Sequence, residues 1–129
     1  MSGTLRVVLV DDSDDIRDLV RLALERDDRL EIVAEATDGG IGLIAIKEHE
    51  PDVVLLDLAM PVKDGLEVLA ALRAHEPMPV VIVLSGFSSG PPEEAAMEAG
   101  AAGYIEKGLS LREIPDRIVH LYETTRSHP

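Results

Sequence analysis

The sequence has no cysteine and no tryptophan, and its aromatic side chains are limited to Phe87, Tyr104 and Tyr122. Without cysteine, neither a disulfide framework nor a thiolate metal site is available, and the redox compartment stays open. With so few aromatic residues, a hydrophobic core has to be built from aliphatic side chains. Apolar residues make up 46% of the 129 residues, which is sufficient for the core of one domain.

Basic residues are also scarce. The chain has 12 lysines and arginines against 25 acidic residues, for a formal charge of −13. Such a chain repels a phosphate backbone, so we expect no direct binding to nucleic acid. The apolar runs are too short for a membrane span, and the start Met-Ser-Gly-Thr lacks the charged and apolar regions of a secretory signal. We therefore expect a cytoplasmic protein without membrane contact.

Short β-rich runs recur along the chain. They are Leu5–Val10, Leu30–Ala36, Val53–Asp57, Val80–Ser85 and Ala102–Ile105. The third and fourth are apolar continuously rather than alternately, which is typical of strands covered on both faces in a parallel sheet.

Helical patterns lie between these runs. The first predicted helix spans Asp14 to Arg26 with Ser13 as its N-cap. Asp38 and Asp64 are expected to cap a second and a third helix. The first helix is expected to turn Ile16, Leu19, Val20, Ala23 and Leu24 inward. The second helix carries Ile41, Ile44 and Ala45, and the third helix turns Leu66, Leu69 and Leu72 inward. Gly39-Gly40 with Gly42 is interpreted as a helix start rather than a phosphate loop, because no G-x-x-x-x-G-K motif exists.

Two prolines, Pro91 and Pro92, suit the opening of a short fourth helix that ends near Gly100. The segment from Ser110 to Glu113 is similar to a capping box that opens the last helix. Pro115 falls one turn into that helix, so the helix is expected to begin later or to bend.

This alternation of strand and helix with short connections predicts the fold class. We expect an α/β protein with a doubly wound, five-stranded parallel sheet flanked by five helices, flavodoxin-like in strand order, (βα)5. The whole chain, residues 1–129, is expected to form one domain, since no linker, repeat or second domain is visible.

Polar residues stand where the strands end. The first strand is followed by Asp11 and Asp12, the third ends in Asp57, the fourth in Ser85, and Lys107 follows the fifth. In an open α/β sheet these ends meet at one edge, where ligands bind. Clustered carboxylates require a cation, and oxygen ligands suit Mg²⁺, with Mn²⁺ as an alternative. A lysine and a hydroxyl facing them are suited to hold the oxygens of a transferring phosphoryl group.

In these features the sequence resembles one family, the CheY-like receiver domains of two-component response regulators. The resemblance extends from Val7 to about Tyr122 and rests on four segments in order: Val7-Val8-Leu9-Val10-Asp11-Asp12, Val54-Leu55-Leu56-Asp57-Leu58-Ala59-Met60-Pro61 with Asp64-Gly65, Val83-Leu84-Ser85-Gly86, and Gly103-Tyr104-Ile105-Glu106-Lys107. Each segment alone is a weak signal, and the four together are a strong one.

The resemblance implies a role for each of these residues. Asp57 is the nucleophile that accepts a phosphoryl group from a phosphohistidine or a small phosphodonor. Asp12 binds the metal directly, Asp11 acts through a water molecule, and the backbone carbonyl of Ala59 is a further ligand. Two more residues contact the phosphoryl oxygens, Lys107 and Ser85. Movement of Ser85 then lets Tyr104 rotate, which repacks the face formed by the fourth helix, fifth strand and fifth helix.

The same resemblance implies a switch protein rather than a turnover enzyme, because it promotes only its own phosphorylation and dephosphorylation. The implied partners are a sensor histidine kinase, a downstream protein target or an output domain, and a second copy in a phosphorylation-linked homodimer.

One departure from the family pattern is Gly108, where proline usually follows the lysine. A trans bond or a strained loop is expected there. The segment from Lys107 to Ser110 is similar instead to the LuxR/NarL-type receiver subgroup, so a stand-alone regulator and the receiver half of a longer DNA-binding regulator both remain open. Ala59 and Phe87 occupy the positions that tune phosphate lifetime in the family, and neither can orient an attacking water, so we expect a moderately long-lived phosphate.

Two other functions compete with this interpretation. Asp12-Ser13-Asp14 fits the D-x-D motif of haloacid dehalogenase-type phosphohydrolases, although that reading leaves Asp57 unexplained. The other alternative is a phosphate-independent, receiver-like interaction module. Asp14, Asp15 and Asp18 are interpreted as favourable charge at a helix start, with kinase docking as the alternative.

Overall fold

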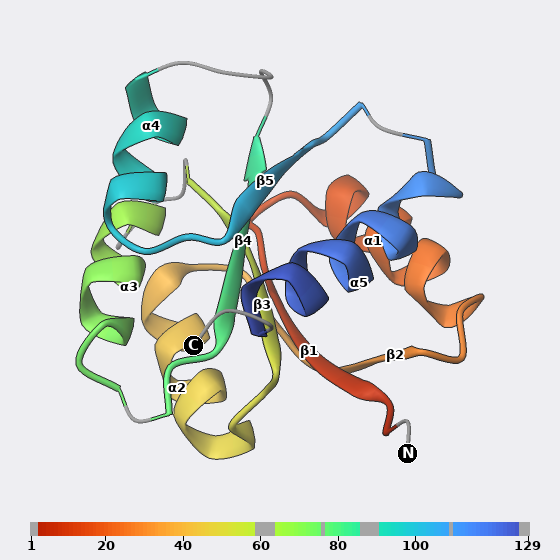
Figure 1. Cartoon of the computed structure of the whole chain (residues 1–129), viewed down its shortest axis with the longest axis horizontal. Coiled ribbons are helices and arrows are strands. Elements are labelled where there is room, and N and C mark those ends of the chain that lie inside the picture. Colours follow the sequence, from red (N-terminus) through yellow and green to blue (C-terminus); the bar gives the residue numbers. More distant parts are fainter. Residues whose placement is uncertain (1–2, 59–63, 76, 86–90, 109, 127–129) are drawn as a thin grey trace.

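The fold is centred on a parallel sheet. The computed structural model describes residues 3–58, 64–75, 77–85, 91–108 and 110–126, with the side chains of residues 85 and 91–93 left out. Within this part of the chain, a five-stranded sheet has the order β2-β1-β3-β4-β5 (Figure 1). Its strands are β1 (Leu5–Val10), β2 (Leu30–Ala36), β3 (Val53–Asp57), β4 (Val80–Ser85) and β5 (Gly103–Glu106). All pairings are parallel, which confirms the expected flavodoxin-like sheet.

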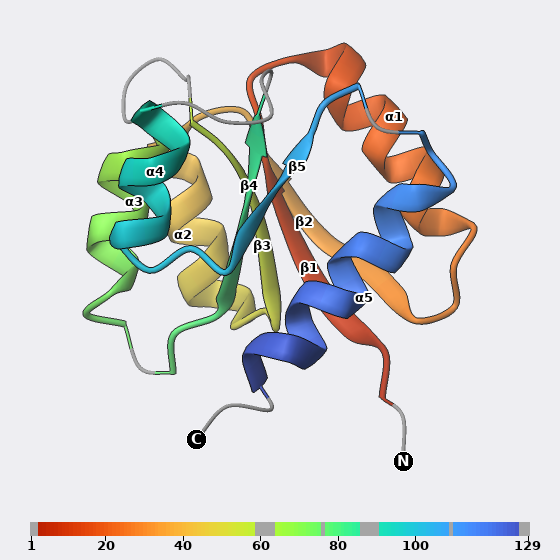
Figure 2. The same cartoon turned by 45° about the horizontal axis from the view of Figure 1, so that its top comes forward.

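Helices cover both faces of the sheet. They are α1 (Asp14–Glu25), α2 (Gly39–His49), α3 (Gly65–Leu72), α4 (Pro91–Glu98) and α5 (Glu113–Arg126). Figure 2 shows α1 and α5 on one face, and α2, α3 and α4 on the other. None of the helices in the described ranges is long and apolar enough to cross a membrane.

Two hydrophobic clusters, one on each side of the sheet, make up the core. On the first side, alternate strand residues pack against Val20, Ala23 and Leu24 of α1 and against Ile118 of α5. On the second side, the intervening strand residues pack against Ile46 of α2 and against α3 and α4. The continuous apolar runs in β3 and β4 follow from this arrangement, since each residue from Val53 to Leu56 and from Val80 to Leu84 belongs to one of the two clusters.

The predicted N-caps of the first three helices are confirmed. The Ser13 hydroxyl accepts a hydrogen bond from the backbone N–H of Ile16, and the Asp38 carboxylate accepts one from Ile41. Asp64 forms a capping box at the start of α3. Residues 39 and 40 open α2, so the glycine-rich segment is a helix start, as predicted.

The capping box predicted from Ser110 to Glu113 for the last helix was wrong, whereas the later helix start expected from Pro115 is confirmed. That helix begins at Glu113, and Ser110 is not its N-cap; the Ser110 hydroxyl instead accepts from the N–H of Arg112 in a preceding turn. Pro115 therefore lies in the first turn, where its missing N–H removes no intrahelical hydrogen bond. Strand β5 also lies one residue later than expected, because Glu106 pairs with Ser85 at the end of β4.

Some apolar side chains of the helices do not face the core. Leu19, which was expected to lie inward, is 46% exposed, and Ile41 and Ile44 are 48% and 60% exposed. In α1 the buried residues are Val20, Ala23 and Leu24, so Leu19 lies at the edge of the apolar stripe. The period of a helix indicates which residues share a face but not how far a neighbouring element covers it.

Candidate functional site

The ends of four strands bring polar residues to one edge of the sheet. Asp11 and Asp12 follow β1, Asp57 ends β3, Ser85 ends β4, and Lys107 follows β5. Asp11, Asp12 and Asp57 can each offer a carboxylate oxygen such that all three atoms lie within 4.8 Å of one another. The three carboxylates that were expected to gather therefore do so.

These carboxylates differ in their exposure to solvent. Asp11 is fully buried and Asp57 is 3% exposed, whereas Asp12 is exposed. The two buried acids continue strands that are apolar on both faces, so the fold forces their carboxylates out of water. Burying an ionised carboxylate is costly unless a cation or hydrogen-bond donors compensate for it.

Lys107 supplies part of that compensation. Its Nζ lies 3.2 Å from Oδ1 of Asp57 and 3.5 Å from Oδ2 of Asp11. Burial acts to lower the pKa of Lys107 and is the largest single influence, but the charges of Asp57 and Asp11 and the direct side-chain contacts with them together outweigh it, so this pKa is raised. The side chain therefore stays an ammonium at neutral pH. Gly108, in place of the usual proline, does not keep Lys107 away from the two acids.

Asp11 is anchored through both its backbone and its side chain. Its N–H donates to the carbonyl of Ala36 at the end of β2 (3.1 Å), and its Oδ1 accepts from the N–H of Ser13 (2.9 Å). Its other oxygen, Oδ2, is buried and accepts no hydrogen bond from the described residues. That oxygen faces the cluster, where Lys107 is 3.5 Å away.

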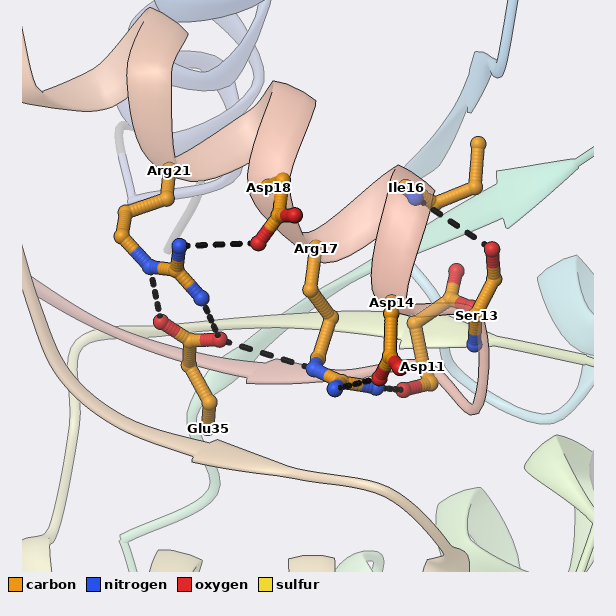
Figure 3. Close-up of polar contacts among 8 residues, drawn as sticks. All are labelled: Asp11, Ser13, Asp14, Ile16, Arg17, Asp18, Arg21 and Glu35. Carbon is orange, nitrogen blue, oxygen red and sulfur yellow. Dashed lines mark hydrogen bonds and ion pairs between the residues drawn. The ribbon is translucent and has the colours of Figure 1, made fainter.

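Arg17 of α1 also reaches this edge, and the sequence patterns did not single it out. Its Nη1 donates to the backbone carbonyl of Asp11 (2.8 Å), and its Nη2 contacts the carboxylate of Asp14. Glu35 of β2 lies on its other side, with Nε to Oε1 at 3.6 Å (Figure 3). An arginine among acids near a helix start has the pattern of a solvated surface residue, so no sequence signal identified this contact.

Gly65, the first residue of α3, lets that helix approach Asp57 closely. A Cβ placed there would lie 2.5 Å from the backbone carbonyl oxygen of Asp57 and 2.7 Å from Cα of Leu58. The Gly65 N–H donates to the carbonyl of Leu58 at 3.0 Å. Only a residue without a side chain fits this contact, which fixes the backbone just after Asp57.

The remaining predicted site residues are placed only in part. Ala59, Phe87 and the side chain of Ser85 lie outside the described residues. Tyr104 is half-buried on β5, where it packs against the second hydrophobic cluster and lines a hollow together with residues of α5, including Arg117.

The donor set fits a hard divalent cation. Its atoms are carboxylate oxygens from three residues, and one of them, Oδ2 of Asp11, is buried without a hydrogen-bond donor among the described residues. Mg²⁺ prefers oxygen ligands and keeps several water molecules, which suits a site with one exposed carboxylate. One lysine cannot neutralise three acids, so a second cation is electrostatically favoured here.

Relatives were found among known proteins by sequence and by structure. The protein-glutamate methylesterase/protein-glutamine glutaminase of Halalkalibacterium halodurans is 38% identical over 92% of this chain and 36% of its own length. The signal receiver domain of the putative response regulator NarL from Mycobacterium tuberculosis superposes with a TM-score of 0.88, at 36% identity, over 94% of this chain and 98% of that one. A LuxR-family two-component response regulator from Aurantimonas sp. SI85-9A1 has a TM-score of 0.86 at 30% identity, covering 95% and 87%.

These relatives differ in length from this chain. It spans about a third of the first curated relatives and nearly all of the NarL receiver domain. The two structural relatives are of the NarL and LuxR types. The first two curated relatives, at 38% and 36% identity, are both named protein-glutamate methylesterase/protein-glutamine glutaminase. The family model for the response regulator receiver domain matches residues 7–119, a span that contains every residue of the acidic edge. The chain belongs to the response regulator receiver domain family.

Proposed function

We propose that this receiver domain is a phosphoacceptor switch in which Asp57 takes up a phosphoryl group with Mg²⁺ bound beside it. The single observation that carries the proposal is the ammonium of Lys107, 3.2 Å from Oδ1 of Asp57, at an edge where three carboxylates gather within 4.8 Å. A nucleophilic carboxylate, a cation site and a fixed positive charge are the groups that phosphoryl transfer requires.

Asp12 would bind the metal directly, because it is the exposed member of the cluster, and Asp57 would share it. Asp11 would act through a water molecule, and the carbonyl of Ala59, outside the described residues, would be a further ligand. Mg²⁺, or Mn²⁺ in its place, would neutralise the negative charge that the phosphoryl oxygens bring to the acids.

The reaction on the protein side is a displacement at phosphorus. A carboxylate oxygen of Asp57 attacks the phosphorus of a phosphohistidine on a sensor kinase or of a small acyl phosphate, in line with the bond that breaks. A new P–O bond to Asp57 forms, and the electron pair of the broken bond leaves with the histidine nitrogen or the acyl oxygen. Lys107 is close enough to follow one phosphoryl oxygen, and Ser85 would donate a hydrogen bond to another. The carboxylate is consumed once per site, so the protein is a switch rather than a turnover enzyme.

The consequence for binding would be expressed on the face formed by α4, β5 and α5. Tyr104 is half-buried on β5 and lines a hollow beside α5. Rotation of that ring after phosphorylation would change what the face presents to a downstream protein, an output domain or a second copy of the chain. The curated relatives, of which this chain spans about a third, support an output domain as the target of this face. The family assignment favours a histidine kinase partner and a cytoplasmic location.

Two alternatives are weaker. In a dehalogenase-type hydrolase the second acid of the D-x-D motif would be Asp14, but this side chain pairs with Arg17 at the start of α1. The family assignment does not favour that reaction. A phosphate-independent interaction module would not require three carboxylates and a lysine to gather at one edge of the sheet. It is the outcome that a negative test would support.

The test is the intact mass of the protein after incubation with acetyl phosphate and Mg²⁺. The parent is expected to gain one phosphoryl group, about 80 Da, and to gain none when Mg²⁺ is chelated during the incubation. Asp57→Asn should gain nothing, whereas Asp28→Asn, which changes an exposed acid outside the cluster, should react like the parent. A parent that stays unmodified with acetyl phosphate and with histidine kinases would refute the phosphoacceptor function.

A further inference from the structure

We infer that Arg17 is a positioning residue for the acidic site: it fixes the peptide that joins Asp11 to Asp12 and thereby sets where the Asp12 carboxylate stands. The inference rests on the function proposed above, because it concerns the same metal site. It assigns a role to a residue of α1 whose described contacts do not include the carboxylate oxygens of the cluster.

The first step is the contact itself. Arg17 donates from Nη1 to the backbone carbonyl oxygen of Asp11 at 2.8 Å. That oxygen belongs to the peptide unit between Asp11 and Asp12, and a peptide unit is planar. Holding its oxygen in place therefore also fixes the direction of the Asp12 N–H and the start of the Asp12 side chain.

The second step is the contrast between the two acids. Asp11 is held independently, through its N–H to Ala36 and through its Oδ1, which accepts from Ser13. Asp12 is exposed, so its carboxylate depends on its backbone for its position more than the buried Asp11 does. The residue proposed to bind the metal directly is thus the one whose placement Arg17 controls.

The third step is that Arg17 is itself held in place. Its side chain is 13% exposed and is flanked by Asp14 on α1 and by Glu35 on β2, as Figure 3 shows. Glu35 is in turn held by Arg21, which donates from Nε and Nη2 to its two oxygens at 2.7 and 2.8 Å. The fork of a guanidinium serves a carbonyl and two carboxylates at once, which the point charge of a lysine cannot do.

A simpler reading is that Arg17 only ties α1 to β2, and Arg21 allows the two readings to be separated. Arg21 lies one turn further along the same helix, binds the same Glu35 and also pairs with Asp18. Its described contacts do not include Asp11. Removing Arg21 should loosen the α1–β2 contact without releasing the Asp11–Asp12 peptide.

The experiment compares the parent with Arg17→Met and Arg21→Met. Mg²⁺ alone is titrated and followed by backbone amide shifts in NMR, which report the folded population only, and thermal unfolding is recorded in parallel. For Arg17→Met the Kd for Mg²⁺ should rise about 10-fold, a usual effect of losing a group that orients a metal ligand. For Arg21→Met it should stay within about 2-fold, although both variants lose thermal stability.

Kinetics supply a second readout. With acetyl phosphate, Arg17→Met should need about 10-fold more Mg²⁺ for half-maximal phosphorylation, while its rate at saturating Mg²⁺ stays near that of the parent. If Arg17→Met does not fold, Arg17→Lys carries the test and should bind Mg²⁺ about 3-fold more weakly than the parent.

Each outcome decides the inference. A parent-like Kd in Arg17→Met, or in Arg17→Lys where that variant replaces it, overturns the positioning role. Equal weakening in Arg17→Met and Arg21→Met also overturns it, since the effect would then be general support of α1 by β2. A parent that neither binds Mg²⁺ nor gains a phosphoryl group contradicts the proposed function instead, so the two failures are distinguishable.

Discussion

Replacing Lys107 with methionine should destabilise the protein in a way that depends on pH. The ammonium lies 3.2 Å from one buried carboxylate and 3.5 Å from another. With an effective dielectric constant of about 20, each of these attractions amounts to about 5 kcal/mol before desolvation is counted. Without the ammonium, two carboxylates with oxygens within 4.8 Å of each other repel by about 3 kcal/mol.

Protonation of one carboxylate limits the free energy that this repulsion can cost. An ordinary aspartic acid titrates near pH 4, so protonating one carboxylate costs about 4 kcal/mol at pH 7 and about 2 kcal/mol at pH 5.5. We therefore expect Lys107→Met to lose about 3 kcal/mol of unfolding free energy at pH 7 and about 2 kcal/mol at pH 5.5. The sign follows from linkage: the native variant binds a proton that the unfolded chain releases, so its stability falls as pH rises.

The assay is urea unfolding of the parent and Lys107→Met at both pH values with a chelator present. Lys47→Met, which changes an exposed lysine in the last turn of α2, serves as the control and should change stability by less than about 1 kcal/mol. Mg²⁺ should restore part of the loss in Lys107→Met at pH 7. Equal stability of the parent and Lys107→Met at pH 7 would refute the reasoning, because the two buried acids would then need no cation.

Other perturbations test other parts of the structure. Gly65→Ala should cost about 2 kcal/mol in thermal unfolding, because its Cβ would lie 2.5 Å from a backbone oxygen. A Cβ at Gly108 meets no atom of the described residues within 4 Å, so Gly108→Ala should be nearly neutral. Glu50→Gly should stabilise the protein by about 0.5 to 1 kcal/mol in urea unfolding, because Glu50 ends α2 with a φ of 46°. Mg²⁺ at ten times its Kd should raise the unfolding free energy of the parent by about 1.4 kcal/mol and have no such effect on Asp57→Asn. The aspartyl phosphate should persist for minutes after the phosphodonor is removed, and a half-life of seconds would contradict the expectation drawn from Ala59 and Phe87.

The strands were the most predictable part of the fold. The runs Val53–Asp57 and Val80–Ser85 have the predicted bounds, because a strand buried on both faces leaves an uninterrupted apolar signal. The start of the last helix was less predictable, since Ser110 offers a hydroxyl that serves a turn as well as a helix cap. The burial of Leu19 was misjudged because it depends on how far α1 is covered, which is a property of the packing.

The candidate site was predictable to the extent that it follows from strand ends. Parallel strands that end in acids must bring those acids together, and Asp11, Asp12 and Asp57 do lie together with Lys107. The role of Arg17 was not predictable, because it contacts a backbone oxygen. Every residue has a backbone oxygen, so the residue type of the partner gives no indication of this contact. Sequence motifs in general do not reveal hydrogen bonds between side chains and the backbone.

The strand order has a consequence for how the chain acquires its function during synthesis. Strand β1 lies beside β2 and β3, so the segments that carry Asp11, Asp12 and Asp57 are all made within the first half of the chain. Lys107 follows β5, which is added last at the edge of the sheet. A nascent chain that stops before β5 can gather the acids but has no ammonium to offset them, so charge repulsion opposes premature closure of this edge. The arrival of the final strand therefore completes both the sheet and the charge balance of the site.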